Sequence, residues 1–164
     1  MANTSPYRSL PAERRLSIVA RAIKGNREMR TLFVQRMLKK GGGFRVATLQ
    51  TWSPDKLARE IVRMNLETAD DELTLLNLLY VEFEPAIQST FLDAAGVTHE
   101  GGQLAEDLQP PFAAADAVAK GAAAVVAAHG DDGRRYLATI AKYNGDAWPG
   151  LDAVIATLAP AVSP

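Results

Sequence analysis

Apolar residues are densest between Asp71 and Glu84, in the sequence DELTLLNLLYVEFE. Eight of these fourteen positions carry leucine, tyrosine, valine or phenylalanine, which is too many for the single apolar stripe of a surface helix. We therefore predict a helix that neighbours cover on most sides, as the central element of a helical core. Thr68 and Asp71 have the spacing of a capping box at its start, and Pro85 predicts a kink or a break at its end.

The helical period of 3.6 residues recurs along the rest of the chain. Further helices are predicted at about 10–24, 27–40, 53–65, 86–95, 110–129, 134–144 and 151–158. Residues 44–51 fit a short strand, an extended loop or one short helix. Residues 97–109 are predicted to be the longest loop, with one helical turn near its end. The pattern predicts an all-α fold, a bundle of about seven or eight helices with an optional short extended segment near residues 44–50.

The polar and apolar composition predicts a flexible N-terminal arm over residues 1–9 and a single all-α domain over residues 10–160. A chain of 164 residues buries roughly 70% of its unfolded surface, which is enough for an autonomous core. Within the domain, a basic helical part at 10–66 precedes an acidic part at 67–160 that is rich in leucine and alanine.

The formal net charge of −1 hides a strong asymmetry. Residues 1–63 hold 14 Lys and Arg against 4 Asp and Glu, a net charge of +10, whereas residues 64–164 hold 4 against 15, a net charge of −11. Such an asymmetry is typical of a nucleic-acid-binding or membrane-surface face. It is equally typical of two halves that pair with each other, either in the monomer or across a dimer.

Cations on the predicted N-terminal helices form two outer stripes and a basic, glycine-containing turn. The candidate polyanion-binding residues are Arg14, Arg21, Lys24, Lys39, Lys40, Lys56, Arg59 and Arg63. The turn, Gly41 to Gly43, separates a helix from a second short helix near residues 44–52, which is the order of elements in a helix-turn-helix. The turn is longer than that motif requires. A phosphate-binding loop is not expected there, because no strand precedes it and Phe44-Arg45 follows it.

The sequence offers weak support for catalysis or for metal binding. The chain has no cysteine, and neither histidine lies three residues after a glutamate, as a di-metal bundle would require. No serine lies in a Gly-x-Ser-x-Gly motif. Glu82 and Glu84 point about 200° apart on a helix. We therefore expect no catalytic residues, metal ligands or cofactor, and assign no ligand to the large aromatic residues.

These patterns favour a non-enzymatic binding or assembly module that acts through self-association or a protein partner. The alternative is a nucleic-acid-binding protein that uses the basic N-terminal helices, and an enzyme of unknown class is a second alternative. The N-terminus lacks the apolar core of a secretory signal, and no run approaches the roughly 18 apolar residues of a membrane span. We expect a cytoplasmic protein.

Overall fold

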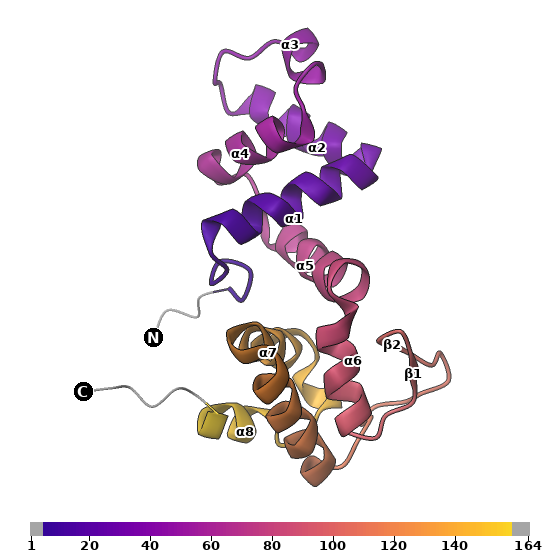
Figure 1. Cartoon of the computed structure of the whole chain (residues 1–164). Coiled ribbons are helices and arrows are strands. Elements are labelled where there is room, and N and C mark those ends of the chain that lie inside the picture. The colour runs from indigo at the N-terminus through magenta and orange to yellow at the C-terminus, as the bar shows by residue number, and fades with distance from the viewer. Residues whose placement is uncertain (1–4, 159–164) are drawn as a thin grey trace, which may run out of the picture. The chain divides into compact units, whose positions relative to one another are not determined.

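A computed structural model describes residues 5–158 of the chain. The fold is all-α, as the sequence predicts: the described part contains eight α-helices, a π-helical segment, a 3-10 turn and one very small antiparallel hairpin (Figure 1). The helices are α1 (Ala12–Gly25), α2 (Arg27–Lys39), α3 (Val46–Gln50), α4 (Pro54–Met64), α5 (Ala69–Asn77), α6 (Pro85–Ala94), α7 (Ala115–Asn144) and α8 (Leu151–Leu158). Within residues 5–158, no helix combines the length and the apolarity that a membrane crossing requires.

The chain divides into two compact units, and the division falls between Leu78 and Leu79. The first unit contains α1 to α5, and the second contains α6, α7, α8 and the hairpin. The single domain over residues 10–160 therefore stays a prediction. The division lies inside the apolar segment that the sequence marked as one central helix.

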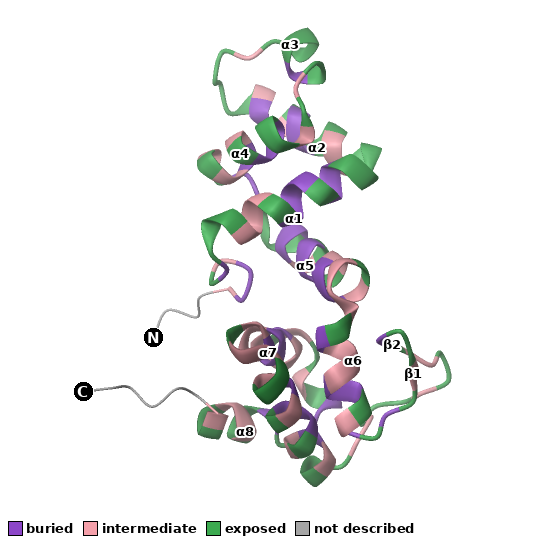
Figure 2. Cartoon of the chain, in the orientation of Figure 1, coloured by how far each residue is buried: buried purple, intermediate pink, exposed green. Residues whose placement is uncertain are grey.

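The core of the first unit forms where α1 packs against α4. Buried segments of the chain are purple in Figure 2. Ile18, Val19 and Ile23 of α1 and Leu57 and Ile61 of α4 are buried. These are the apolar positions that recur with the helical period, so the packing follows directly from the sequence pattern.

Residues 5–9, the described part of the arm predicted over residues 1–9, contact the rest of the first unit. Residues 1–4 lie outside the described part of the chain. Tyr7 is fully buried, and its hydroxyl group donates a hydrogen bond to Glu67. Arg8 hydrogen-bonds to Glu72. A predominantly polar composition suggested a solvated arm, but one aromatic side chain and one arginine anchor this segment to the unit.

Two predicted helix starts are confirmed by their capping contacts. The hydroxyl group of Ser53 accepts a hydrogen bond from the amide of Lys56, with Pro54 as the first helical residue of α4. Thr68 and Asp71 form the predicted capping box at the start of α5. Between α2 and α4, the short-helix alternative for residues 44–51 is the one observed, because α3 occupies five of them.

The apolar segment at 71–84 is not one continuous α-helix. Its first part is α5, and Leu78–Phe83 form a π-helix, η1. The break predicted at Pro85 is confirmed, since α6 begins there with proline in its first turn. The π-helix was not predicted, because apolar density does not distinguish α from π hydrogen bonding.

The second unit is built around the contact between α6 and α7. Gly121 of α7 lies so close to Phe91 of α6 that a Cβ atom there would be 2.8 Å from the Phe91 carbonyl oxygen. Tyr136 and Trp148 both pack edge-to-face on the Phe91 ring. The predicted break at Gly130 is confirmed, because its φ of 55° and ψ of −125° interrupt the α7 helix.

Two predictions for the second unit are wrong. Residues 97–109 contain the hairpin β1 (His99–Glu100) and β2 (Gln103–Leu104), where the sequence predicted a loop with a helical turn near residues 104–108. The glycines at 101 and 102 both have positive φ, which permits the tight reversal. The following helix begins at Ala115 and not at the two prolines at 110 and 111.

Candidate functional site

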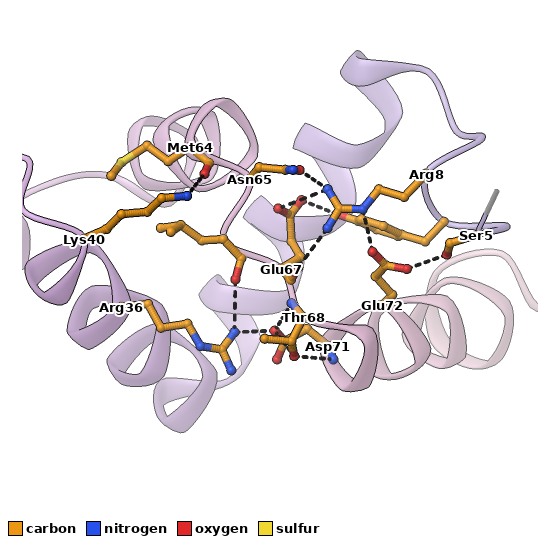
Figure 3. Close-up of polar contacts among 12 residues, drawn as sticks. Ser5, Arg8, Arg36, Lys40, Met64, Asn65, Glu67, Thr68, Asp71 and Glu72 are labelled. Carbon is orange, nitrogen blue, oxygen red and sulfur yellow. Dashed lines mark hydrogen bonds and ion pairs between the residues drawn. The ribbon is translucent and has the colours of Figure 1, made fainter. Parts of the chain in front are cut away.

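Three carboxylates beside the start of α5 are held by cations from the N-terminal segment and α2 (Figure 3). Arg8 hydrogen-bonds to Glu72 and donates to the backbone carbonyl of Glu67 at 2.8 Å. Arg36 donates to Asp71. We call Glu67, Asp71 and Glu72 the carboxylate cluster; all three residues are buried. Two arginines of residues 1–63, Arg8 and Arg36, thus pair with acids of residues 64–164 inside the first unit.

Burial, hydrogen bonds and nearby charges shift the pKa values of two groups at the carboxylate cluster, Tyr7 and Asp71. Burial, and then the charge of Glu67, raise the pKa of Tyr7, so its phenol keeps its proton and donates to Glu67 Oε1 at 2.9 Å. Burial raises the pKa of Asp71, but hydrogen bonds from Arg36 and Thr68 and the charge of Arg36 outweigh it. As a result, the pKa of Asp71 lies below its ordinary value. The cluster therefore occupies Arg8 and Arg36, neither of which is a candidate polyanion ligand.

The eight candidate residues remain largely available to solvent. Arg14 is half-buried in α1, and the other seven side chains are exposed. They are distributed over three elements of the first unit. Arg14, Arg21 and Lys24 lie on α1, Lys39 and Lys40 at the end of α2, and Lys56, Arg59 and Arg63 on α4.

The packing of α1 on α4 brings two cations of α1 next to the first turn of α4. Arg21 and Lys24 line a surface hollow of about 250 Å³ together with Asp55, in the first turn of α4. Arg59 lies four residues after Asp55, so the two are neighbours on the α4 surface, and Lys56 is three residues before Arg59. We call the set Arg21, Lys24, Lys56 and Arg59 the basic face.

The remaining cations of α2 and α4 lie toward the other end of α4. The ammonium group of Lys40 donates to the Met64 carbonyl at 2.7 Å, which neutralises the negative end of the α4 dipole. Arg63 pairs with Glu60 at 2.6 Å, and this hydrogen bond, together with the charge of Glu60, raises the pKa of Arg63. An 11-residue helix is about 16 Å long, so cations near opposite ends of α4 are well separated and the eight candidates do not form one cluster.

Sequence reasoning missed one cation and an aromatic pair next to the basic face. Arg45 is exposed directly before α3. Phe44 and Trp52 form an edge-to-face pair, and the Lys56 ammonium group lies 4.3 Å from the Trp52 ring centroid. The spacing of four residues between Trp52 and Lys56 is a signal that could have indicated this contact. α3 itself is one turn and a half long, too short to act as the recognition helix of a helix-turn-helix.

The histidines of the second unit have structural contacts. Nε2 of His99 lies 2.8 Å from Asp93 Oδ1, and its Nδ1 accepts from the Gly102 amide at 3.0 Å. Although His99 lines a surface hollow of about 430 Å³, both of its ring nitrogens are already engaged. His129 contacts the hydroxyl group of Thr90. Across residues 5–158, no group of three or more potential ligands is arranged to hold a metal ion.

The chain matches no protein-family model, no curated protein and no solved structure.

Proposed function

We propose that the first unit binds a polyanion, with nucleic acid as the favoured class, through the basic face. The observation that carries the proposal is the exposure of its four cations around the N-terminal half of α4, on two helices that pack together. Phosphate contacts require positive charge and reach but no deep pocket, so an exposed face is sufficient.

The charge of the first unit supports this proposal after internal pairing is taken into account. Residues 5–78 hold 14 Lys and Arg against 8 Asp and Glu, a net charge of +6. Nine of these cations are exposed, whereas only four of the acids are. Three of the other acids form the buried carboxylate cluster and are held by Arg8 and Arg36. The exposed residues of the unit therefore carry a net charge of +5, so most of its positive net charge lies at the surface.

The length of α4 is also suitable for a strand of phosphates. Lys56, Arg59 and Arg63 follow one another along its surface at helical spacing, and Lys40 lies at its C-terminal end. With about 3.4 Å per nucleotide in a duplex strand, the roughly 16 Å of this helix correspond to about five nucleotides. Several phosphates can therefore contact these four cations at the same time.

Self-association, or binding of a protein partner, stays a prediction with less support from the geometry. Its support in the sequence is the high apolar content of the leucine-rich and alanine-rich helices. Within residues 5–158, the exposed large apolar side chains are Leu32 and Val46, both outside those helices. In the alanine-rich helix, Gly121 packs against Phe91 of α6, and Ala122 is fully buried. None of the described large apolar side chains of those two helices is exposed.

The proposal is tested with the double variant Lys24→Ala/Arg59→Ala, which removes one cation from each helix of the basic face. Affinity for a fluorescently labelled single-stranded oligonucleotide is measured by anisotropy over a series of salt concentrations. Each lost phosphate contact reduces the slope of log affinity against log salt by about 0.7, so we expect a reduction of about 1.4. Elution mass on the same samples reports any change in self-association.

The matched control is Lys120→Ala/Lys142→Ala, which removes the same charge from exposed positions on α7. We expect the control to keep the wild-type slope and affinity. If both double variants weaken binding equally, net charge and not the basic face determines affinity, and the proposed contact surface is wrong.

A further inference from the structure

Phe44 and Trp52 are the partly accessible aromatic residues of the first unit. Their ring centroids are 5.4 Å apart with an interplanar angle of 82°, and both side chains are half-buried. By contrast, the other two aromatic side chains described in this unit, Tyr7 and Phe33, are fully buried. Burial of only one side of an aromatic pair leaves ring surface for a contact with another molecule.

The backbone around the aromatic pair is held by specific contacts. Arg30 of α2 donates to the Trp52 carbonyl oxygen at 2.7 Å and also reaches that of Gln50. Gly42 packs so closely on Phe44 that a Cβ atom there would lie 2.4 Å from the ring. The position of the pair is thus set before any ligand binds, which reduces the entropy lost on binding.

The sequence around the aromatic pair is rich in cations. Residues 39–59 contain five Lys and Arg and one acid, Asp55, a net charge of +4. Among these cations, Arg45 is adjacent to Phe44 in sequence, and the ammonium group of Lys56 lies over the Trp52 ring at 4.3 Å. Lys56 is exposed on a flexible stem, so it can leave the ring for a nearby phosphate while a flat ligand takes its place.

Aromatic rings interleaved with cations match the recognition chemistry of single-stranded nucleic acid, in which bases stack on side chains and cations follow the backbone. In a duplex, the faces of the bases are occupied by neighbouring bases. Resting on the proposed polyanion binding, we infer that the ligand is a single-stranded nucleic acid and that one of its bases stacks on Trp52 in the place of the Lys56 ammonium group.

The first test compares two probes that carry the same phosphates: an oligothymidylate of about ten nucleotides and an abasic oligomer of equal length. Trp52 fluorescence is recorded during titration of the full-length protein. Trp148 is only 4% exposed, and the variant Trp52→Phe measures its background signal directly. We expect the oligothymidylate to quench Trp52 and to bind about 10-fold more tightly than the abasic oligomer.

The second test uses side chains that differ in stacking ability. Trp52→Leu is expected to weaken oligothymidylate binding about 10-fold without changing the salt slope, because no charge is lost. Trp52→Phe keeps an aromatic face and is expected to retain most of the affinity. Thermal unfolding followed by circular dichroism verifies that both variants are folded. If Trp52→Leu does not fold, the comparison of the two probes on the unaltered protein decides whether a base stacks on Trp52.

The outcomes separate this inference from the proposed function. Equal affinity for the oligothymidylate and the abasic oligomer, without quenching, overturns base stacking but leaves polyanion binding intact. Absence of binding to both probes at low salt overturns the proposed function and the inference together. Tighter binding of a duplex of the same length than of the single strand also contradicts the inference.

Discussion

At the scale of single residues, the first unit contains buried carboxylates that interact with tyrosine and arginine side chains. The Glu67 side chain has no solvent exposure; Tyr7 donates to one of its oxygens, and Arg8 lies 3.8 Å from the other. A buried carboxylate is costly unless hydrogen bonds and opposite charge compensate it. These two partners also explain why the N-terminal segment is anchored.

Tyr7→Phe is predicted to destabilise the protein by about 1–3 kcal/mol, because it leaves a buried carboxylate oxygen of Glu67 without its donor. The free energy of unfolding is measured in urea. A double-mutant cycle with Glu67→Gln isolates the contact, and the two changes should be non-additive. Additive effects would show that the hydrogen bond does not stabilise the fold.

Asp71→Asn is predicted to lower stability at neutral pH by about 1–3 kcal/mol, because it removes the charge that Arg36 binds. The pKa of Asp71 is lowered in the folded state, so its contribution is fully present above the ordinary carboxyl pKa of about 3.9. That contribution is lost as the pH falls through the folded-state pKa. Urea unfolding at several pH values should therefore show the wild type and the variant converging below about pH 4. A constant difference over this range would contradict the assignment.

At the scale of elements, local capping and glycine signals were the most informative parts of the sequence. Ser53, Thr68 and Asp71 mark helix starts through contacts within three residues, so no tertiary information is needed to recognise them. Gly130 likewise ends a helical stretch because its backbone conformation excludes other residues. Each of these predictions depends on interactions that are local in the chain.

The elements that the sequence did not predict depend on packing or on distant contacts. The π-helix η1 carries the same apolar density as an α-helix, so its hydrogen-bonding pattern is invisible in the periodicity. The hairpin at His99 is held partly by Gln88, which donates to the Gly102 carbonyl oxygen from α6. Such a contact between two elements cannot be read from the polar sequence of the loop alone.

Gly121→Ala is predicted to destabilise the second unit by about 1–3 kcal/mol, because the added Cβ atom would lie 2.8 Å from the Phe91 carbonyl oxygen and force α6 and α7 apart. The intrinsic preference of alanine for helices offsets only part of this cost. Gly145→Ala is the control: its backbone is helical, and no described atom lies within 4 Å of the added Cβ. Thermal unfolding should show a lower midpoint for Gly121→Ala only; equal midpoints for both variants would contradict the close packing.

At the scale of the whole molecule, net charge is a poor guide to binding. The formal charge of −1 combines a net charge of +6 over residues 5–78 with −7 over residues 79–158. Interactions between exposed charges are screened beyond about 8–10 Å at ordinary ionic strength. A ligand at the basic face therefore responds mainly to local cations, and a nearly neutral protein can bind a polyanion in a salt-dependent manner.

The candidate site could be predicted only in part at this scale. The helical period placed Lys56, Arg59 and Arg63 on one outer stripe, because that spacing is a property of the helix itself. The meeting of Arg21 and Lys24 with the first turn of α4 required the packing of α1 on α4. The sequence pattern does not indicate which faces of two separate helices pack together.

The most direct test of polyanion binding is the salt dependence of affinity for a labelled single-stranded oligonucleotide, measured by fluorescence anisotropy on the unaltered protein. Four phosphate contacts at the basic face predict that log affinity falls with log salt with a slope of about −3. A steep slope of this size would support the account. Absence of binding at low salt, or an affinity that does not change with salt, would contradict it.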